Sequence, residues 1–436
     1  MLHLLITAIP FAAGVALALL AAWRRWAPPV GAAVAAGAAF RVFVAVTSWR
    51  DSWQPPDFMY QFTDAIRAVL HHQDPLRLPN SEWHFLPPMA YVNAGAYRLG
   101  ELTHVPWQLI GRVVPVGADV VLIVLVGALA GGGSRRRMAA FQYASNPLPI
   151  MICAIHGQVE PVASALGVGA LLLAMRGRPR PHASGALLGL AIAVNSWPVL
   201  LVPGMLQAAA GWRSRLTTLA WACAVPLAFL VTGPIVIGYP ARFLPGDVHA
   251  LASPRGVIGD WGWTVLVTGG HQAIMPAWAR AGMVILLIVL GAVWYVWRRA
   301  HPVDLIAAMN LAFLASSDRV SAQYLVWPVP CQQARPARGT QVALVACAAW
   351  AGAGYLWLSR APTDDAWELM HIPWAYSSLA IVPFLVFAMP WRRRARRDDT
   401  AIPRGTAHPG RVREAVGVRG RWVPRRRGAL ESRPSD

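Results

Sequence analysis

Apolar residues form long runs along most of the chain, from its N-terminus to Pro390, with short polar segments between them. Many of these runs approach the ~20 residues that an α-helix needs to cross about 30 Å of hydrocarbon. Hydrophobic residues make up 56% of the sequence and charged residues only 14%. The pattern predicts an all-α polytopic membrane protein with about 11–13 transmembrane helices.

Arginine clusters beside the apolar runs orient these helices, because such clusters are expected on the cytoplasmic side. The predicted spans are 2–22, 28–47, 105–130, 139–155, 161–175, 216–237, 277–297, 302–316, 322–334, 340–358 and 372–390. Segment 184–208 is predicted to form two short helices that turn back, because Pro198 removes a backbone donor in its middle. The N-terminus is then outside and the C-terminus inside.

Three longer segments face outward in this orientation, namely 48–105, 238–276 and 359–371. The first contains Phe62, Ile66 and Leu70 at helical spacing, which predicts an amphipathic helix over 62–72. An amphipathic helix at this place is expected to lie at the membrane edge rather than to cross the bilayer.

Composition divides the chain into two regions. Residues 1–390 form the predicted transmembrane domain, with 48–105 as its extracytoplasmic catalytic loop. Residues 391–436 are rich in Arg, Pro and Gly and poor in apolar residues. This composition predicts a disordered cytoplasmic tail.

The chain is strongly basic, with a net charge of +19, and all 39 of its basic residues are Arg. Much of the charge lies in the tail and most of the rest beside apolar spans. This distribution favours topology signalling and contact with lipid headgroups over binding of nucleic acid. The absence of Lys excludes a Schiff-base lysine and a Walker-type phosphate lysine.

Acidic residues are rare, yet six of the 20 lie close together, namely Asp51, Asp57, Asp64, Asp74, Glu82 and Glu101. Asp57 follows two prolines, which stiffen the backbone that carries its carboxylate. A carboxylate at the membrane edge can act as a general base toward a hydroxyl acceptor. The alternative interpretation is that Asp57 caps the N-terminus of the following helix. Asp64 is a weaker candidate, equally suited to the start of the amphipathic helix.

A second polar group joins two apolar spans in the segment His156-Gly-Gln158-Val-Glu160. Ionisable groups at membrane depth usually face a cavity or a partner. His156 and Gln158 could donate to sugar hydroxyls or to phosphate, and Glu160 could accept from a sugar. A polar turn between helices is an equally good reading of the pattern.

A third polar group lies at the outer end of a late span. Arg319 is suited to hold a phosphate through a bidentate guanidinium contact. A surface ion pair with Asp318 is the alternative. Tyr324 and Trp327 fit interfacial anchoring better than sugar stacking.

Four motifs follow one another over residues 40–330: Pro56-Asp57-Phe58-x-Tyr60 with Asp74-Pro75, Phe85-Leu-Pro-Pro88-x-Ala-Tyr91, Asn146-Pro147 with His156-Gly-Gln158, and Ser321-x-Gln323-Tyr324-x-x-Trp327. In this joint order they resemble the GT-C superfamily of integral-membrane glycosyltransferases, above all the polyprenol-phosphate-mannose-dependent mannosyltransferases. One departure is Asn195, which stands where many relatives carry Lys. Arg319 is therefore expected to supply that donor contact.

The resemblance implies an inverting transfer of a hexose, expected to be mannose, from a polyprenyl-phosphate donor to a hydroxyl of a glycolipid or glycan acceptor. Asp57 matches the catalytic aspartate of the family's first loop. The expected substrate-binding residues are Tyr60, Asp64, His156, Gln158, Glu160, Arg319, Gln323 and Tyr324. The active site is expected on the extracytoplasmic face of the plasma membrane. No cofactor is required, and the spacing does not call for the metal that Asp51 and Asp57 could bind.

Two other functions use the same features differently. A transporter or lipid flippase would use broken helices such as 184–208. It is disfavoured because the polar residues gather at the outer face and no inverted repeat is visible. A non-catalytic scaffold would use the Arg-rich tail to bind anionic lipid or a cytoplasmic partner.

Overall fold

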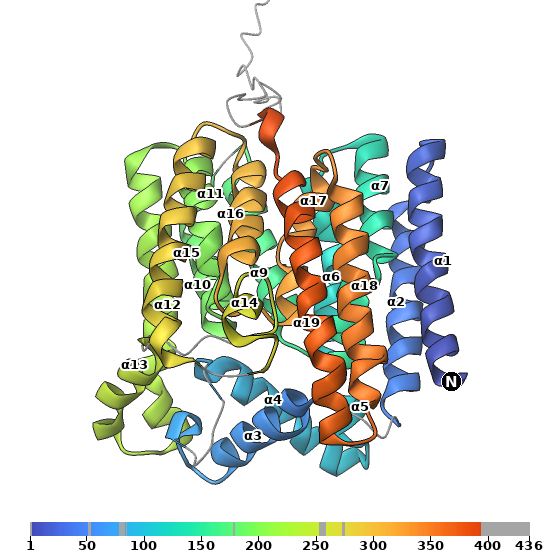
Figure 1. Cartoon of the computed structure of the whole chain (residues 1–436). Helices are drawn as coiled ribbons and strands as arrows, with labels where there is room; N and C mark the ends of the chain where they lie inside the picture. The colour runs from blue at the N-terminus through green and yellow to red at the C-terminus, as the bar shows by residue number, and fades with distance from the viewer. Residues whose placement is uncertain are drawn as a thin grey trace, which may run out of the picture.

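The computed structural model of the chain describes residues 2–50, 54–77, 83, 85–177, 179–252, 259–272 and 275–393. Within these ranges the elements are helices, and none is a strand. Figure 1 shows an upright bundle of helices with a layer of shorter helices beneath one end. The predicted all-α polytopic fold is confirmed. Asp51, Glu82 and the predicted tail beyond Arg393 lie outside the described residues.

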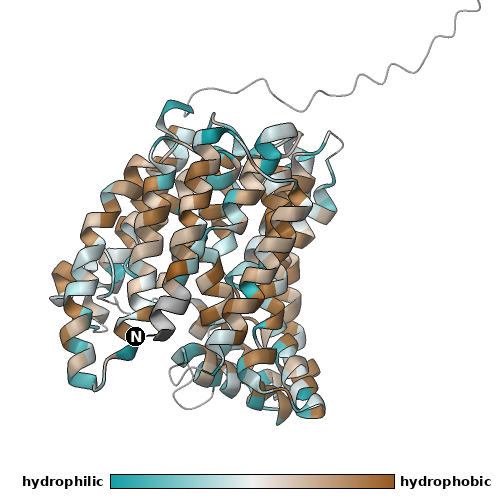
Figure 2. Ribbon diagram, turned by 90° about the vertical axis from the view of Figure 1, so that its right-hand side faces the viewer, coloured by the Kyte–Doolittle hydropathy of each residue, from teal (hydrophilic) through white to brown (hydrophobic). Residues whose placement is uncertain are grey.

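The long helices of the bundle are α1 (Leu2–Arg24), α2 (Val30–Ser48), α6 (Val113–Leu129), α12 (Gly211–Ile237), α15 (Pro276–Trp297), α18 (Thr340–Leu356) and α19 (Asp364–Phe387). Among the described residues, six helical segments are long and apolar enough to cross a membrane. Figure 2 shows hydrophobic residues along these helices, and many are exposed, such as Leu287 and Ile288 on α15. Their exposed surface fits contact with lipid, so the chain is a multi-pass membrane protein.

Shorter helices fill the interior of the bundle: α7 (Gly133–Ala144), α8 (Pro147–Ile150), η3 (Met151–His156), α9 (Glu160–Ala174), α10 (Pro181–Val194), η4 (Trp197–Leu201), α11 (Val202–Ala208), α16 (Pro302–Ser316), η6 (Ala322–Val326) and α17 (Val329–Ala334). The predicted break within 184–208 is confirmed, because α10 ends at Val194 and the chain resumes as η4 and α11.

Two predicted continuous spans are also broken, which corrects the prediction. The span 139–155 consists of α7, α8 and η3. The break follows from Asn146, whose side chain accepts a hydrogen bond of 3.0 Å from the backbone N–H of Leu148 and so caps a new helix. The span 322–334 consists of η6 and α17, with Pro328 at the junction.

The layer beneath the bundle is called here the loop end. It contains η1 (Asp57–Gln61), α3 (Phe62–Leu70), η2 (Pro75–Arg77), α4 (Pro87–Thr103), α5 (Trp107–Ile110), η5 (Ala241–Phe243) and α13 (Leu244–Ala252). The predicted amphipathic helix is α3, and its apolar face is buried, with Phe62 1% and Ile66 0% exposed. Aromatic rings continue this contact from Phe62 to Trp83 and then to Phe85. The loop end therefore packs on the bundle as an ordered layer.

The interior contains a fully buried ion pair that the sequence did not reveal. Arg41 of α2 contacts Asp119 of α6, with Nε and Oδ2 2.5 Å apart and both side chains fully buried. Tyr143 of α7 donates to the other oxygen of Asp119 at 2.5 Å, and Arg41 also donates to the backbone oxygen of Ala144 at 3.0 Å. These contacts join α2, α6 and α7.

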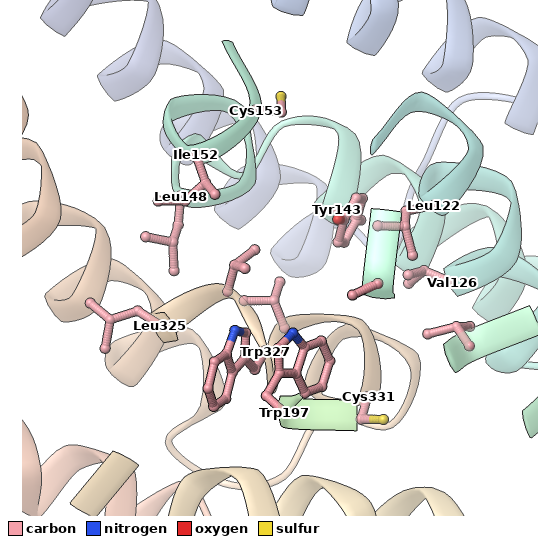
Figure 3. Packing of buried hydrophobic residues seen from close by; sticks show 14 of the residues in the cluster. Leu122, Val126, Tyr143, Leu148, Ile152, Cys153, Trp197, Leu325, Trp327 and Cys331 are labelled. Atoms are coloured by element: carbon pink, nitrogen blue, oxygen red, sulfur yellow. The ribbon is translucent and has the colours of Figure 1, made fainter. Parts of the chain in front are cut away.

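Aromatic stacking joins the interrupted helices of the interior. Trp197 of η4 stacks on Trp327, which follows η6, with ring centroids 4.9 Å apart and planes inclined by 12°. Figure 3 shows the two rings beside each other among buried side chains such as Leu325. Because η6 also packs against α9 and α18, this stack connects segments that are far apart in the sequence.

Candidate active site

Asp57 begins η1, a π-helical turn that leads directly into α3. Its side chain is 30% exposed. One carboxylate oxygen, Oδ2, accepts a hydrogen bond of 2.8 Å from Nε2 of Gln158, and Nε2 of His156 lies 3.3 Å from the same oxygen. The structure thus brings together the predicted catalytic residue and two of the predicted substrate-binding residues.

His156 and Gln158 reach Asp57 because of the glycine between them. His156 ends η3, another π-helical turn, and Gly157 follows with φ +75°. That conformation suits glycine, and a Cβ at this position would lie 2.7 Å from the ring of Phe58. Gly157 therefore lets η3 end against Phe58, beside Asp57. π-Helical turns are rare and often occur at functional sites.

Tyr355 of α18 completes the cluster, with its hydroxyl 2.5 Å from Nδ1 of His156. The Asp57 carboxylate only accepts hydrogen bonds, so the Gln158 atom beside it must be the amide nitrogen. The second N–H of that amide faces Nε2 of His156 at 3.0 Å. When Nε2 accepts it, His156 carries its proton on Nδ1 and donates to Tyr355. A second proton, on Nε2, would turn the contact with Asp57 into an ion pair.

Arg112, at the start of α6, holds both sides of this cluster in place. It is 1% exposed, and its guanidinium donates to the backbone oxygen of Ile155 at 2.6 Å and to the side chain of Gln54 at 2.7 Å. It also lies 4.6 Å from the centre of the Phe58 ring. Arg112 thus connects the segment before Asp57 with the segment before His156.

Glu160 lies deeper in the bundle than Asp57, and the two carboxylates are close enough to interact electrostatically. Glu160 is 1% exposed, and its Oε1 accepts a hydrogen bond of 3.4 Å from Asn195. Its other oxygen is buried and makes no hydrogen bond within the described chain. The indole N–H groups of Trp197 and Trp327 are unsatisfied in the same way. Groups of this kind can bind hydroxyls of an entering ligand.

The other predicted residues lie elsewhere around the site. Tyr60 is 70% exposed, and Asp64 is half exposed on α3 with Arg67 3.5 Å away. Both point away from the buried face of this segment. Arg319 lies in the turn between α16 and η6, where its backbone N–H donates to the Ser317 hydroxyl at 3.2 Å.

Gln323 and Tyr324 belong to η6 and are partly exposed. The Tyr324 ring lies against Trp327, with centroids 4.4 Å apart. Because η6 packs against α9 and α18, these two residues border the helices that carry Glu160 and Tyr355. Tyr60 and Asp64, in contrast, face outward.

Two residues of the cluster were missed by sequence reasoning. Arg112 is a charged residue within a predicted apolar span, and such a charge is a signal of a functional or structural partner. Tyr355 has no such signal, because a tyrosine near the end of a span resembles an interfacial anchor.

A metal site depends on several ligands in one place. Among the described residues, no three His, Cys, Asp or Glu side chains gather in a way that could hold a metal ion. Asp51, which the sequence offered as a partner of Asp57 in binding a metal, lies outside those residues.

The fold and the cluster define a multi-pass helical membrane protein with a polar site where the bundle meets the loop end. The model of glycosyltransferase family 87 matches residues 96–317, just over half of the chain. The chain belongs to this family and is a membrane glycosyltransferase, as the GT-C resemblance predicted. The matched range includes His156, Gln158 and Glu160, whereas Asp57 and Tyr355 lie outside it. No curated protein matches the chain.

Proposed function

We propose that the enzyme transfers a hexose, most simply mannose, from a polyprenyl-phosphate donor to a hydroxyl of a glycolipid or glycan acceptor. The observation that carries the proposal is the Asp57 carboxylate, held by Gln158 yet still 30% exposed. A carboxylate that is fixed and open on one side is suited to take a proton from an acceptor hydroxyl. The family assignment supports sugar transfer over the transporter and scaffold alternatives.

The reaction would proceed by a single displacement. Asp57 takes the proton of the acceptor hydroxyl, and the hydroxyl oxygen attacks the anomeric carbon of the donor sugar. The bond from that carbon to the phosphate oxygen breaks, and the polyprenyl phosphate leaves with the electron pair. Attack opposite the leaving group inverts the anomeric configuration. Because phosphate is a good leaving group, no second catalytic carboxylate is needed.

The donor phosphate needs a cationic partner at the site. We infer that Arg319 supplies it, in place of the lysine that Asn195 replaces, and that it stabilises the charge that develops on the leaving group. His156 would take up the proton from Asp57 after transfer, because Nε2 and the carboxylate lie 3.3 Å apart. Glu160 and Asn195 would accept and donate hydrogen bonds to the sugar.

The orientation in the membrane completes the proposal. The short arginine clusters beside the helices favour a cytoplasmic position for the end of the bundle opposite the loop end. The loop end, with Asp57, would then work on the extracytoplasmic face of the plasma membrane, where a lipid donor can enter from the outer leaflet.

The test compares two aspartates of the same segment in purified membranes supplied with labelled polyprenyl-phosphate mannose. Asp57→Asn should lose transfer by at least about 100-fold, the range expected for loss of a general base. Asp64→Asn is the matched control, because Asp64 is half exposed, and it should retain transfer. Equal activity of wild type and Asp57→Asn would refute the role of Asp57. Transfer of another labelled sugar but not of mannose would refute mannose while keeping the mechanism.

A further inference from the structure

Residues 260–263, Asp-Trp-Gly-Trp in sequence, contact the end of α16 from a distant part of the chain. The indole N–H of Trp261 donates a hydrogen bond of 2.7 Å to the backbone oxygen of Leu314. The indole N–H of Trp263 donates one of 3.0 Å to the backbone oxygen of Ser316, the last residue of α16. The last carbonyl groups of an α-helix lack partners within the helix, so the two tryptophans cap the end of α16.

The same segment is anchored to α19. Gly262 has a φ of +58°, which favours glycine and turns the chain between the two tryptophans. Its backbone N–H donates a hydrogen bond of 2.8 Å to the buried hydroxyl of Ser378. The carboxylate of Asp260 lies 3.0 Å from Nε2 of His371, and Nδ1 of that ring lies 2.9 Å from the backbone oxygen of Gly270. The segment is therefore fixed to α19 while its indoles hold α16.

Stacked aromatic rings support the segment from α18. The ring of Trp261 meets Trp350 edge-on, with centroids 4.8 Å apart. Trp350 stacks on Trp374 of α19 at 4.0 Å, and each of these two indoles donates to the backbone oxygen of the other at 3.0 Å. In Figure 1, α14 (Thr264–Thr268), which follows the segment, lies beside α16 and α19. These contacts join three helices of the bundle around the end of α16.

The end of α16 leads directly into the turn that carries Arg319. Ser317 follows the helix and is 2% exposed. Its hydroxyl accepts a hydrogen bond of 3.2 Å from the backbone N–H of Arg319 and donates one of 3.2 Å to the backbone oxygen of the same residue. The chain then enters η6, which packs against α9 and α18. A shift of the end of α16 would therefore move Arg319 relative to these helices of the site.

We propose that Trp261 and Trp263 are positioning residues for Arg319, and that they fix its guanidinium where it contacts the donor phosphate. The inference rests on the proposed function, because it takes Arg319 as the partner of that phosphate. A guanidinium that is set in place before the donor arrives loses little freedom on binding, so it holds the phosphate more tightly. The two tryptophans act through Arg319 and not by contact with the donor.

The test measures binding of a polyprenyl phosphate and of the matching uncharged polyprenol to the purified full chain in detergent. Trp263→Phe keeps an aromatic ring and removes the indole N–H. It should weaken binding of the phosphate about fivefold, the factor expected for one lost hydrogen bond. Binding of the polyprenol should stay unchanged, and an equal loss for both ligands would overturn the proposal. Trp278→Phe is the matched control, because Trp278 is 42% exposed on α15, and it should bind both ligands like the wild type.

A double-mutant cycle shows whether Trp263 acts through Arg319. Arg319→Gln should weaken binding of the polyprenyl phosphate. Addition of Trp263→Phe to Arg319→Gln should then cause no further loss, because the group that Trp263 positions is already absent. A role of Trp263 in folding alone would give the same loss with and without Arg319, and this result would overturn the proposal.

A second variant covers the case in which Trp263→Phe does not fold. Ser378→Ala removes the hydroxyl that anchors the segment to α19 and should also weaken binding of the phosphate. Ser377→Ala is its control, because the Ser377 hydroxyl is exposed and bonds within α19. Wild-type affinity in Trp263→Phe and Ser378→Ala, with a loss in Arg319→Gln, would overturn the inference and leave the proposed function standing. Wild-type affinity in Arg319→Gln would refute the role of Arg319 in the proposed function, and the inference with it.

Discussion

The side-chain amide of Gln158 donates a hydrogen bond of 2.8 Å to the carboxylate of Asp57, across 101 positions of the chain. The bond ties the first turn of the loop end to the end of η3 inside the bundle. It fixes one oxygen of the carboxylate and leaves the side chain 30% exposed. A base held in this way loses little entropy when it meets an acceptor hydroxyl.

Removal of this bond should slow transfer without unfolding the protein. Gln158→Leu is expected to lower kcat by roughly tenfold to hundredfold, because the carboxylate loses its orientation. Gln158→Glu keeps the shape but places a second negative charge beside Asp57. A like charge raises the pKa of a carboxyl, so the rise in rate with pH should move to higher pH in this variant. The pH–rate profile checks both, and an unchanged profile for Gln158→Glu would contradict the contact.

The hydrogen bond between Tyr355 and His156 is expected to contribute to the rate of transfer by positioning the imidazole. Tyr355→Phe removes the hydroxyl 2.5 Å from Nδ1 of His156 and keeps the ring. The loss of one hydrogen bond of about 1 kcal/mol predicts a fall in kcat of roughly fivefold, with little change in KM. Tyr376→Phe is the control, because Tyr376 is 39% exposed on α19. Steady-state kinetics of the two variants should differ, and equal rates would leave Tyr355 without a role in positioning His156.

The arrangement of helices could be predicted well from apolar runs, because a membrane requires long apolar segments and proline breaks them. The break between α10 and η4 follows from this rule. The break at Asn146 was missed, because the apolar run continues through Pro147 and only the cap marks the new helix. Apolar patterning therefore locates helices better than it locates interruptions within them.

The site was harder to predict than the helices, because its contacts cross long distances in sequence. His156 and Tyr355 are 199 positions apart, and no local pattern links them. Tyr60 and Asp64 were expected to bind substrate because of the resemblance to the GT-C glycosyltransferases. The helical path of η1 and α3 turns both side chains outward. Nearness along a helix does not imply that two side chains share a face.

The buried pair of Arg41 and Asp119 should carry much of the stability of the bundle. Asp119→Leu leaves the guanidinium buried without its partner and should lower the free energy of unfolding by about 3–5 kcal/mol. The double variant with Arg41→Met should be more stable than the single variant, because no unpaired charge remains. Chemical denaturation in mixed micelles measures both.

The matched control for this pair is Glu101→Leu. Its partner Arg98 lies 2.7 Å away, but both side chains are largely exposed. An exposed pair contributes less than about 1 kcal/mol, so the control should unfold almost like the wild type. A loss in Asp119→Leu no larger than the loss in this control would show that the buried pair is not a main support of the fold.

Asp74, at the loop end, should make stability depend on pH. It is 5% exposed, and burial raises the pKa of its carboxyl to about 6 from an ordinary value of 3.8. The neighbouring Asp247 raises this pKa further, whereas the Leu76 N–H and the Arg77 guanidinium oppose the increase. The folded state thus binds a proton more tightly than the unfolded state does. The stabilisation is present at pH below about 4 and is lost as pH rises through about 6.

The contribution of Asp74 to the free energy of unfolding is therefore expected to decrease as the pH rises from 4 to 6. Asp74→Asn should remove that part of the slope, because the amide keeps the hydrogen bond from Leu76 and does not ionise. Asp64→Asn, at an exposed position of the neighbouring helix α3, should keep the wild-type slope. Denaturation curves at a series of pH values distinguish the variants. A wild-type slope in Asp74→Asn would mean that the response is controlled by another group that binds its proton more tightly in the folded than in the unfolded chain.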